Sequence, residues 1–276
     1  MGSKADFRPV RACIFDMDGL LLNTEDIYSQ CANLVLAKYG KPDIPWSIKA
    51  RLQGRPGPEA NKLFNNWAQL PITNEEYAAE VSVHQRAFFP TAKPLPGVEA
   101  LLAALESTKR APAPGPRVHI ALATSSHSKN FELKTTHLTD LFSVFPAERR
   151  VLGDDPRIAP GRGKPLPDIF LLALKSINDT LPEGEMPIEP EECLVFEDSV
   201  PGVEAGRRAG MRVLWCPHPM LAKEYAGREE EVLTGRTGEA GAVDLHQLGQ
   251  LGDGWGQYLP TLENFPYDKY GIKVVQ

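Results

Sequence analysis

The stretch that decides the fold is Val10-Arg11-Ala12-Cys13-Ile14-Phe15-Asp16-Met17-Asp18-Gly19, where a short apolar run ends at two acids and a glycine. Such a run, partly β-branched, is typical of a buried strand. In an extended chain, residues two apart point to the same side, so Asp16 and Asp18 can face one site. Gly19 then permits a sharp turn. Asp16 is a candidate nucleophile and metal ligand and Asp18 a candidate proton shuttle; the alternative is an acidic turn without a role.

Further apolar runs repeat this arrangement along the chain. We predict strands at Val118 to Ala123, Cys193 to Phe196 and Arg212 to Cys216, and a shorter one at Val151 to Gly153. Apolar residues at helical spacing predict helices over 97–109 and 168–177. Proline at the start and glycine at the end predict another over 201–210. Alternating strands and helices indicate an α/β fold, with a Rossmann-like parallel sheet covered by helices on both faces.

Residues from about 24 to 95 break this alternation, because their patterns are helical with no strand between them. Helices are predicted over 24–39, 58–70 and 74–89. Thr73 and Glu76 form a capping-box pattern at the start of the third. We predict an inserted α-helical cap domain at 23–96 and a catalytic core made of 1–22 and 97–276. The proline-rich segment 90–97 and the segment around Asn23 suit a pair of hinges.

Composition excludes several classes of protein. The net charge of −6 predicts no nucleic-acid partner, and the four cysteines have no spacing typical of a zinc site or disulfide framework. No apolar stretch reaches the roughly 18–20 residues that a membrane span needs. We therefore expect a cytoplasmic, monomeric protein without a membrane partner. Residues 110–116 are predicted to be a stiff surface loop, and the poorly patterned residues 217–276 to be loosely ordered.

Phosphate-binding candidates follow the second strand and precede a later helix. Thr124, Ser125 and Ser126 offer hydroxyls and backbone amides between a strand and a helix, which suits a phosphate, although a plain helix N-cap uses the same residues. Lys164 lies between a glycine and a proline just before a predicted helix. Its charge could meet a phosphate oxygen; alternatively, it is an ordinary surface lysine.

Glu197 and Asp198 leave the end of a third buried strand. Adjacent acids there are costly unless a cation lies nearby, and a hard divalent ion with oxygen ligands would explain them. All four clusters lie at predicted carboxyl ends of strands or in loops just beyond, where open α/β sheets bind ligands. Together they supply a nucleophile, an acid/base, metal ligands and a phosphate clamp, which are the parts of a phosphoryl-transfer site.

The motifs DMDG, LATSS, GKPLPDIF and FEDSVPGVEAGRRAG resemble, in order and spacing, those of the haloacid-dehalogenase-like superfamily. The resemblance covers residues 10–216, and the helical insert matches that superfamily's helical type of cap. Longer stretches, such as IFDMDGLLLNTE and CLVFEDSVPGVEAG, are similar to the pseudouridine-5′-phosphatase family and its fungal relatives. Asn23 departs from that pattern, which usually has an acid at this position.

The resemblance implies a role for each acid. Asp16 would attack phosphorus and form an aspartyl-phosphate. Asp18 would protonate the leaving oxygen and then activate water. The Asp16 carboxylate, the Asp18 backbone carbonyl and Asp198 would bind Mg²⁺, with Glu197 holding a water of the ion's coordination shell. True dehalogenases of the superfamily lack the second acid of the first motif, so Asp18 disfavours dehalogenation.

The resemblance also implies that Thr124, the Ser125 backbone amide and Lys164 grip the phosphoryl oxygens. We expect magnesium-dependent hydrolysis of a small phosphorylated metabolite, namely a nucleoside, sugar or polyol phosphate. A β-phosphoglucomutase-like phosphomutase is the alternative, although the residues where the mutase has its histidine and arginine are Tyr28 and Gly57 here. A non-enzymatic protein is disfavoured by the intact set of acids. In the cap, Arg55 either contacts the leaving group or is a solvated surface residue.

Overall fold

The apolar run before Asp16 forms a central strand of the sheet. The structure is a computed structural model that describes residues 7–55, 57–110, 117–238 and 249–274. Within these ranges, β1 (Ala12–Phe15) is completely buried, as expected for a strand with helices on both faces. It pairs in parallel with β2 (His119–Ala123) and β4 (Cys193–Glu197). The predicted strands are confirmed, with ends shifted by one or two residues.

The sheet has six strands in the order β3-β2-β1-β4-β5-β6, and all neighbouring strands are parallel. The remaining strands are β3 (Arg150–Val151), β5 (Arg212–Trp215) and β6 (Gly256–Tyr258). Because the strands are parallel, their carboxyl ends meet at one edge. Asp16, Thr124 and Asp198 follow β1, β2 and β4 at that edge.

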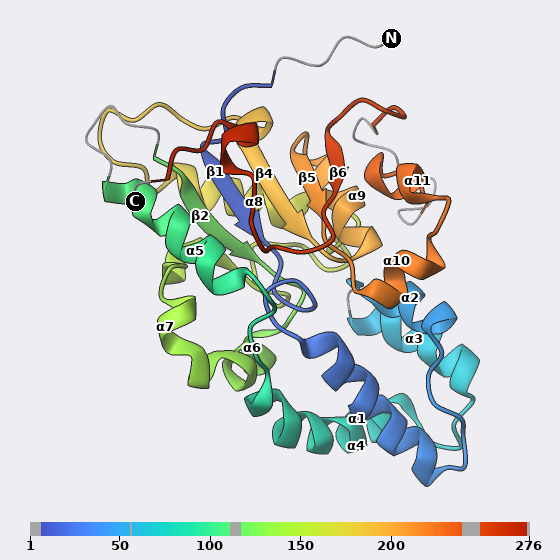
Figure 1. Cartoon of the computed structure of the whole chain (residues 1–276). Coiled ribbons are helices and arrows are strands. Elements are labelled where there is room, and N and C mark those ends of the chain that lie inside the picture. Colours follow the sequence, from blue (N-terminus) through green and yellow to red (C-terminus); the bar gives the residue numbers. More distant parts are fainter. Residues whose placement is uncertain (1–6, 56, 111–116, 239–248, 275–276) are drawn as a thin grey trace.

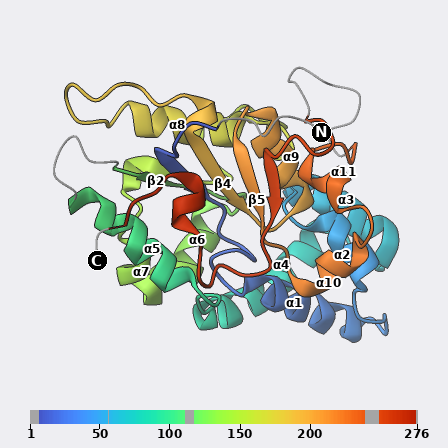
Figure 2. The ribbon, with the colours of Figure 1, turned by 45° about the horizontal axis from the view of Figure 1, so that its top comes forward.

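Alternate residues of β1 pack on opposite faces of the sheet. Cys13 and Phe15 join a cluster with α5 (Val98–Ser107) and α6 (Ser128–Thr135), whereas Ala12 and Ile14 pack with α8 (Asp168–Asn178) and α9 (Val200–Arg208). Figures 1 and 2 show these helices covering the two faces. Alternate side chains of β1 are thus buried under helices on opposite faces, which confirms the predicted sheet with helices on both faces.

A helical layer follows β1 directly. It consists of α1 (Thr24–Lys38), α2 (Trp46–Leu52), α3 (Gly57–Ala68) and α4 (Asn74–Phe88). The three predicted helices are present, and so is the capping box, in which Thr73 Oγ1 accepts from the Glu76 amide at 3.1 Å and Glu76 Oε2 from the Thr73 amide at 2.8 Å. The short α2 was not predicted. Figure 1 shows the layer on the side of the sheet where β1 leads into α1.

The two segments that join this layer to the sheet lie side by side. The Asn23 amide donates to the Lys93 carbonyl at 3.0 Å, and Asn23 Oδ1 accepts from the Lys93 amide at 2.8 Å. The Leu95 amide donates to the Leu21 carbonyl at 3.0 Å. Asn23 therefore contributes a side-chain hydrogen bond to the paired segments, which a carboxylate could also accept.

The prediction of a loosely ordered tail is wrong for the described residues between 217 and 274. They form α10 (Pro219–Glu224), α11 (Glu229–Leu233) and the edge strand β6. Beyond β6, Phe265, Tyr270 and Ile272 are buried in the same cluster as α5. Figure 2 shows this segment crossing that face of the sheet. Single apolar residues spread among turns leave no periodic signal, so the sequence pattern missed them.

Chain segments far apart in sequence meet closely at Gly97. This residue has φ +85°, and a Cβ there would lie 2.3 Å from the Glu263 backbone nitrogen, so only glycine fits.

The loop predicted over 110–116 lies, after Arg110, outside the described residues. No helix within the described ranges is both long and apolar enough to cross a membrane.

Candidate active site

Asp16 lies where β1 ends, and its backbone amide continues the ladder by donating to the Phe196 carbonyl at 3.0 Å. Its side chain is 8% exposed and accepts a hydrogen bond from Lys164 Nζ. Burial raises the pKa of Asp16 to about 7, although the Lys164 charge opposes that rise. Lys164 also donates to Glu197 Oε1 at 2.6 Å and to the Ala123 carbonyl at 3.1 Å. The lysine thus ties the ends of three strands together.

Three buried carboxylates gather at this edge. Asp16, Glu197 and Asp198 each offer an oxygen atom, and these atoms lie within 4.8 Å of one another. Glu197 is already well used, because its Oε2 accepts from the backbone amides of Asp198 and Ser199, both at 3.1 Å. A Cβ at position 202 would lie 1.9 Å from its carboxylate, so Gly202 is needed for this packing. Asp16 and Asp198 are left as the two acids best able to face an ion.

Asp198 is the least compensated of these acids. Burial, together with the negative charges of Glu197 and Asp16, raises its pKa well above the ordinary value. Within the part of the chain that the structure describes, it forms no ion pair, and its Oδ2 accepts from the amide of Gln53. Gln53 comes from the loop after α2, so the helical layer reaches the acid cluster directly.

Asp18 is held quite differently. Its Oδ1 accepts from Thr24 Oγ1 and from Lys134 Nζ, both at 2.6 Å, and its Oδ2 accepts from Ser126 Oγ at 2.6 Å. Burial alone would raise its pKa, but Lys134 and these hydrogen bonds outweigh burial and lower it below the ordinary value. Neighbouring acids two residues apart therefore have opposite shifts, which suits a division of chemical roles.

The segment after β2 lies beside the segment after β1. Thr124 is completely buried, and its Oγ1 accepts from the Ser126 amide at 3.1 Å. Ser125 Oγ lies 3.4 Å from the Gly54 carbonyl of the helical layer. A Cβ at Gly153 would lie 2.1 Å from the Ser125 carbonyl oxygen, so this turn is packed against the strand end beside it.

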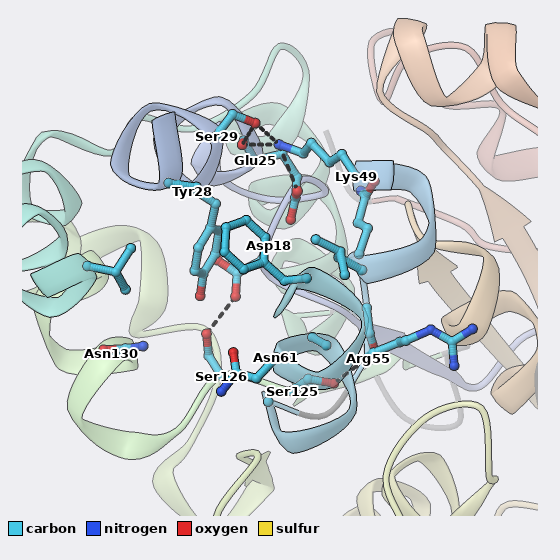
Figure 3. Close-up of a pocket in the computed structure, with 18 of the residues that line it drawn as sticks. Asp18, Glu25, Tyr28, Ser29, Lys49, Arg55, Asn61, Ser125, Ser126 and Asn130 are labelled. Carbon is cyan, nitrogen blue, oxygen red and sulfur yellow. Dashed lines mark hydrogen bonds and ion pairs between the residues drawn. The ribbon is translucent and has the colours of Figure 1, made fainter. Parts of the chain in front are cut away.

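A cavity of about 370 Å³ lies between the sheet edge and the helical layer. Its sheet side is lined by the predicted site residues Asp16, Asp18, Thr124, Ser125 and Asp198. Lys164 is not on the cavity wall, because its Nζ reaches Asp16 from behind. Figure 3 shows the polar groups converging from both sides, Asp18 and Ser126 from the sheet and Glu25, Tyr28 and Lys49 from the helices.

Several charged groups here escaped the sequence reasoning. Lys134 is a completely buried lysine on α6, and Lys49 pairs with Glu25, with 3.2 Å between Lys49 Nζ and Glu25 Oε2. Arg55, in contrast, was a candidate from the sequence; it lines the cavity, and its Nε donates to the Arg51 carbonyl at 2.7 Å. Lysines on helices are mostly exposed. Only the helical spacing from a buried apolar neighbour, such as Phe131 three residues before Lys134, could have indicated that such a lysine is buried.

The charges of this region suit a divalent cation. Five carboxyl groups face three ammonium groups, so full ionisation of the acids would leave two negative charges without a lysine. The groups are Asp16, Asp18, Glu25, Glu197 and Asp198, with Lys49, Lys134 and Lys164. The available donors are hard oxygen atoms, which magnesium prefers. The donor set therefore fits the expected metal ion.

Comparison with known proteins agrees with this geometry. A family model described as haloacid dehalogenase-like hydrolase matches residues 10–210. The chain is 42% identical to a probable pseudouridine-5′-phosphatase of Saccharomyces cerevisiae, over 95% of this chain and 98% of the yeast protein. It is 37% identical to the mitochondrial (DL)-glycerol-3-phosphatase 1 of Arabidopsis thaliana, over 80% of this chain and 68% of that one. A Thermotoga maritima structure provisionally assigned as a β-phosphoglucomutase matches at a TM-score of 0.53 and 32% identity, covering 76% and 86% of the two chains.

Proposed function

The chain belongs to the haloacid dehalogenase-like hydrolase family and is a phosphatase of small phosphorylated substrates, and from this premise we propose that it hydrolyses phosphomonoesters by way of a phosphorylated Asp16, with magnesium. The observation that carries the proposal is the position of Asp16 on the cavity wall, within 4.8 Å of the acidic oxygen of Asp198 and in contact with Lys164.

Asp16 attacks phosphorus in the first step. One carboxylate oxygen forms the new P–O bond while the bond to the leaving oxygen breaks, which gives an aspartyl-phosphate and an alcohol. Lys164 fixes the direction of the carboxylate and balances its charge from behind the cavity wall. Thr124 and the Ser125 backbone amide, at the end of the neighbouring strand, bind the phosphoryl oxygens in this proposal.

Asp18 handles the protons. It gives a proton to the leaving oxygen in the first step and takes one from water in the second, when water attacks phosphorus and restores Asp16. The structure holds Asp18 through Thr24, Ser126 and Lys134, beside the same cavity. These donors lower the pKa of Asp18 and so favour its carboxylate form, which is the form that the second step requires.

Magnesium, when bound by the Asp16 carboxylate, the Asp18 carbonyl and Asp198, would neutralise negative charge on the phosphoryl group. Glu197 stays behind these ligands in our assignment, because Lys164 and two backbone amides already occupy its oxygens.

The helical residues 23–96 are assigned as a cap that closes over the core of 1–22 and 97–276. The paired segments at Asn23 and Lys93 are the proposed hinge, and closure would exclude water from the first step. Crystal structures with and without a bound phosphate analogue would show two cap angles; one unchanged angle would count against the assignment.

The substrate in this proposal is a nucleoside, sugar or polyol phosphate. A cavity of about 370 Å³ holds a ligand of that size, and the relatives named for pseudouridine 5′-phosphate and glycerol 3-phosphate support the class. The phosphomutase alternative is disfavoured at Tyr28, whose hydroxyl accepts from Lys134 where the mutase would have a histidine. The cytoplasmic location and monomeric state stay predictions.

The experiment is release of inorganic phosphate from a panel of sugar, polyol and nucleoside monophosphates in magnesium buffer, with Asp16→Asn as the matched control. Phosphate release by the wild type alone would support the proposal. Isomerised sugar phosphate without net phosphate release would identify a mutase, and no reaction with any monoester would contradict the hydrolase assignment.

A further inference from the structure

Lys134 is a charged group that the reaction scheme does not yet use directly. Its side chain is completely buried on α6, and its Nζ lies 4.5 Å from the ring centres of both Tyr28 and Phe89. Burying an ammonium group among rings is costly unless its donors are satisfied. A lysine kept here therefore needs strong local partners, and the partners show what it contacts.

All three N–H groups of Lys134 have acceptors. Nζ donates to Asp18 Oδ1 at 2.6 Å, to Tyr28 Oη at 2.7 Å and to Ser126 Oγ at 2.8 Å. An ammonium group has three donors, so its orientation is fully determined by these contacts. Ser126 in turn donates to Asp18 Oδ2 at 2.6 Å, so the lysine contacts one carboxylate oxygen directly and the other through a hydroxyl.

These contacts connect Asp18 with the helical layer. Thr24, which also donates to Asp18, and Tyr28, which accepts from Lys134, are four residues apart on α1 and so share one helix face. Figure 3 shows Tyr28 beside Asp18, with Asp18 joined to Ser126. The direction of the Asp18 carboxylate thus depends on α6, on the turn after β2 and on the first turns of α1.

We propose that Lys134 is a positioning residue for the phosphatase reaction, which aims the Asp18 carboxylate at the reacting oxygen and is itself aimed by the Tyr28 hydroxyl. This inference rests on the function proposed above. Lys134 does not line the cavity, so it acts through Asp18 rather than by touching substrate. A shift of α1 against the sheet would change the Tyr28 and Thr24 contacts together, which couples the cap to proton transfer.

Positioning through Asp18 has a distinctive kinetic consequence. An alkyl phosphate has a poor leaving group that must be protonated, whereas 4-nitrophenyl phosphate releases its phenolate without help. Lys134→Met should therefore lower kcat for glycerol 3-phosphate by about 100-fold, the scale of a misplaced catalytic group, and leave KM unchanged. The burst of nitrophenolate, which reports Asp16 phosphorylation, should keep its rate.

The control variant is Lys129→Met, which removes an exposed lysine from the same helix and should leave both rates unchanged. Lys134→Arg should restore part of the lost kcat, because it keeps a charged donor near Asp18. Tyr28→Phe removes only the hydroxyl and should lower kcat for glycerol 3-phosphate several-fold. It also serves as the deciding variant if Lys134→Met fails to fold.

A double-mutant cycle separates positioning from a general structural role. The measured rate is the decay of phosphorylated Asp16, followed by intact mass after a pulse of 4-nitrophenyl phosphate. Lys134→Met should slow this decay in the wild-type background and have no further effect in the Asp18→Asn background, because both changes remove one function. Tyr28→Phe should behave in the same way.

Equal losses in both backgrounds would overturn the inference, and so would wild-type kcat in a folded Lys134→Met protein. A nitrophenolate burst that is slowed as much as kcat for glycerol 3-phosphate would also overturn it. The proposed function fails separately, if the wild type neither releases phosphate from a monoester nor carries phosphate on Asp16.

Discussion

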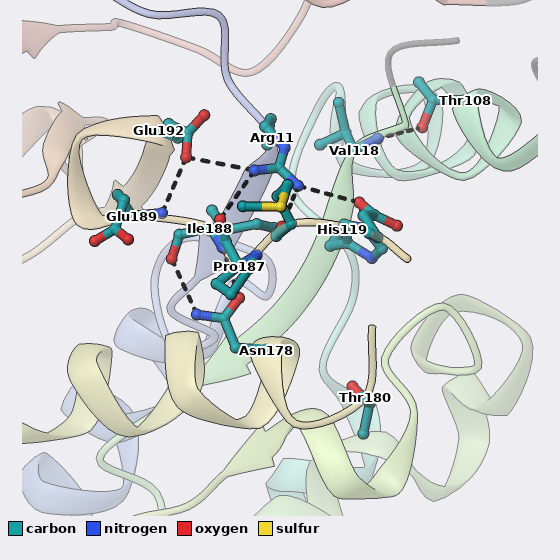
Figure 4. A network of polar contacts seen from close by, with 12 residues as sticks. Arg11, Thr108, Val118, His119, Asn178, Thr180, Pro187, Ile188, Glu189 and Glu192 are labelled. Carbon is teal, nitrogen blue, oxygen red and sulfur yellow. Dashed lines mark hydrogen bonds and ion pairs between the residues drawn. The ribbon is translucent and has the colours of Figure 1, made fainter. Parts of the chain in front are cut away.

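The two ends of the sheet treat charge in opposite ways. At the amino end, Arg11 donates to the Met186 carbonyl at 2.7 Å and lies 3.4 Å from Glu185 and from Glu192. His119, completely buried, contacts Glu185 Oε1 at 2.7 Å through Nε2. Figure 4 shows this network around the start of β1 and β2. The charged and polar groups there satisfy one another.

At the carboxyl end the acids outnumber the lysines. We therefore expect the charges at the amino end to stabilise the fold and those at the carboxyl end to serve function. Arg11 and His119 outweigh burial and lower the pKa of Glu185, as expected for an anion stabilised by its neighbours. Burial and like charges raise the pKa of Asp198, as expected for an anion that the metal-free fold disfavours. A buried acid of this kind beside a cavity is a candidate for binding a ligand.

The largest expected effect is the loss of turnover at the carboxyl end alone. Asp16→Asn replaces the nucleophile by a nearly isosteric amide, so kcat should fall by about 10⁴-fold or more. Glu185→Gln, the matched change at the amino end, should keep kcat. Steady-state phosphate release with circular dichroism of both variants measures this. Near-normal turnover in sequence-verified Asp16→Asn would remove Asp16 from the mechanism.

Metal removal should affect the same end. Excess chelator should stop hydrolysis, and added magnesium should raise the melting temperature by mass action, because only the folded state holds the ligands together. Asp198→Asn should reduce that rise, whereas Glu185→Gln should retain it. Full activity in metal-free buffer, or an equal magnesium response in both variants, would contradict the metal assignment.

The stability of the metal-free protein should respond with opposite signs at the two ends. Asp198→Asn removes a disfavoured charge and should raise the free energy of unfolding by about 1 kcal/mol, the scale of one pKa unit. Glu185→Gln weakens contacts with Arg11 and His119 and should lower it by roughly 1 kcal/mol. Urea unfolding in chelator measures both changes. If both variants change the free energy of unfolding in the same direction, the two ends of the sheet do not differ as described.

The pH dependence should show the smallest effect, again with opposite signs. Burial raises the pKa of Asp16 to about 7, so the folded protein keeps a proton that the unfolded chain loses above about 4. Its contribution to the free energy of unfolding therefore falls as pH rises from about 4 to about 7. Burial lowers the pKa of His119 below 6.5, so the unfolded chain binds a proton that the folded protein does not. That contribution falls as pH decreases below 6.5.

Urea unfolding of metal-free protein from about pH 5 to about pH 8 separates these terms. Asp16→Asn should remove the part of the decline toward higher pH that Asp16 causes, and His119→Gln should remove the part of the acid decline that His119 causes. Unchanged slopes in both variants would mean that neither group titrates as its burial implies.

The strands and the carboxyl-end motifs could be predicted because each is a local pattern. A buried run such as Cys193 to Phe196 is continuous, and parallel topology then places the acids that follow it at one edge. The capping box at Thr73 is equally local. These features need no knowledge of distant contacts.

Other features depend on contacts between distant segments and left no local signal. The helix α2 has seven residues and no side-chain cap, and β6 has three residues in a glycine-rich stretch. Lys134 is recognisable only once Asp18, Ser126 and Tyr28 surround it. Gln53 likewise belongs to the site only through its hydrogen bond to Asp198, which lies 145 positions later in the sequence. Tertiary packing, rather than propensity, decides these cases.

The central claim is that the acid-rich end of the sheet transfers phosphate through Asp16. Its most direct test is intact mass and peptide mapping of Asp18→Asn after rapid quench with 4-nitrophenyl phosphate and magnesium. We expect one burst of nitrophenolate, then a stall, with one phosphoryl group retained on Asp16, because water is no longer activated. Continued turnover with no phosphate on the protein at any time would contradict it and favour direct attack by water.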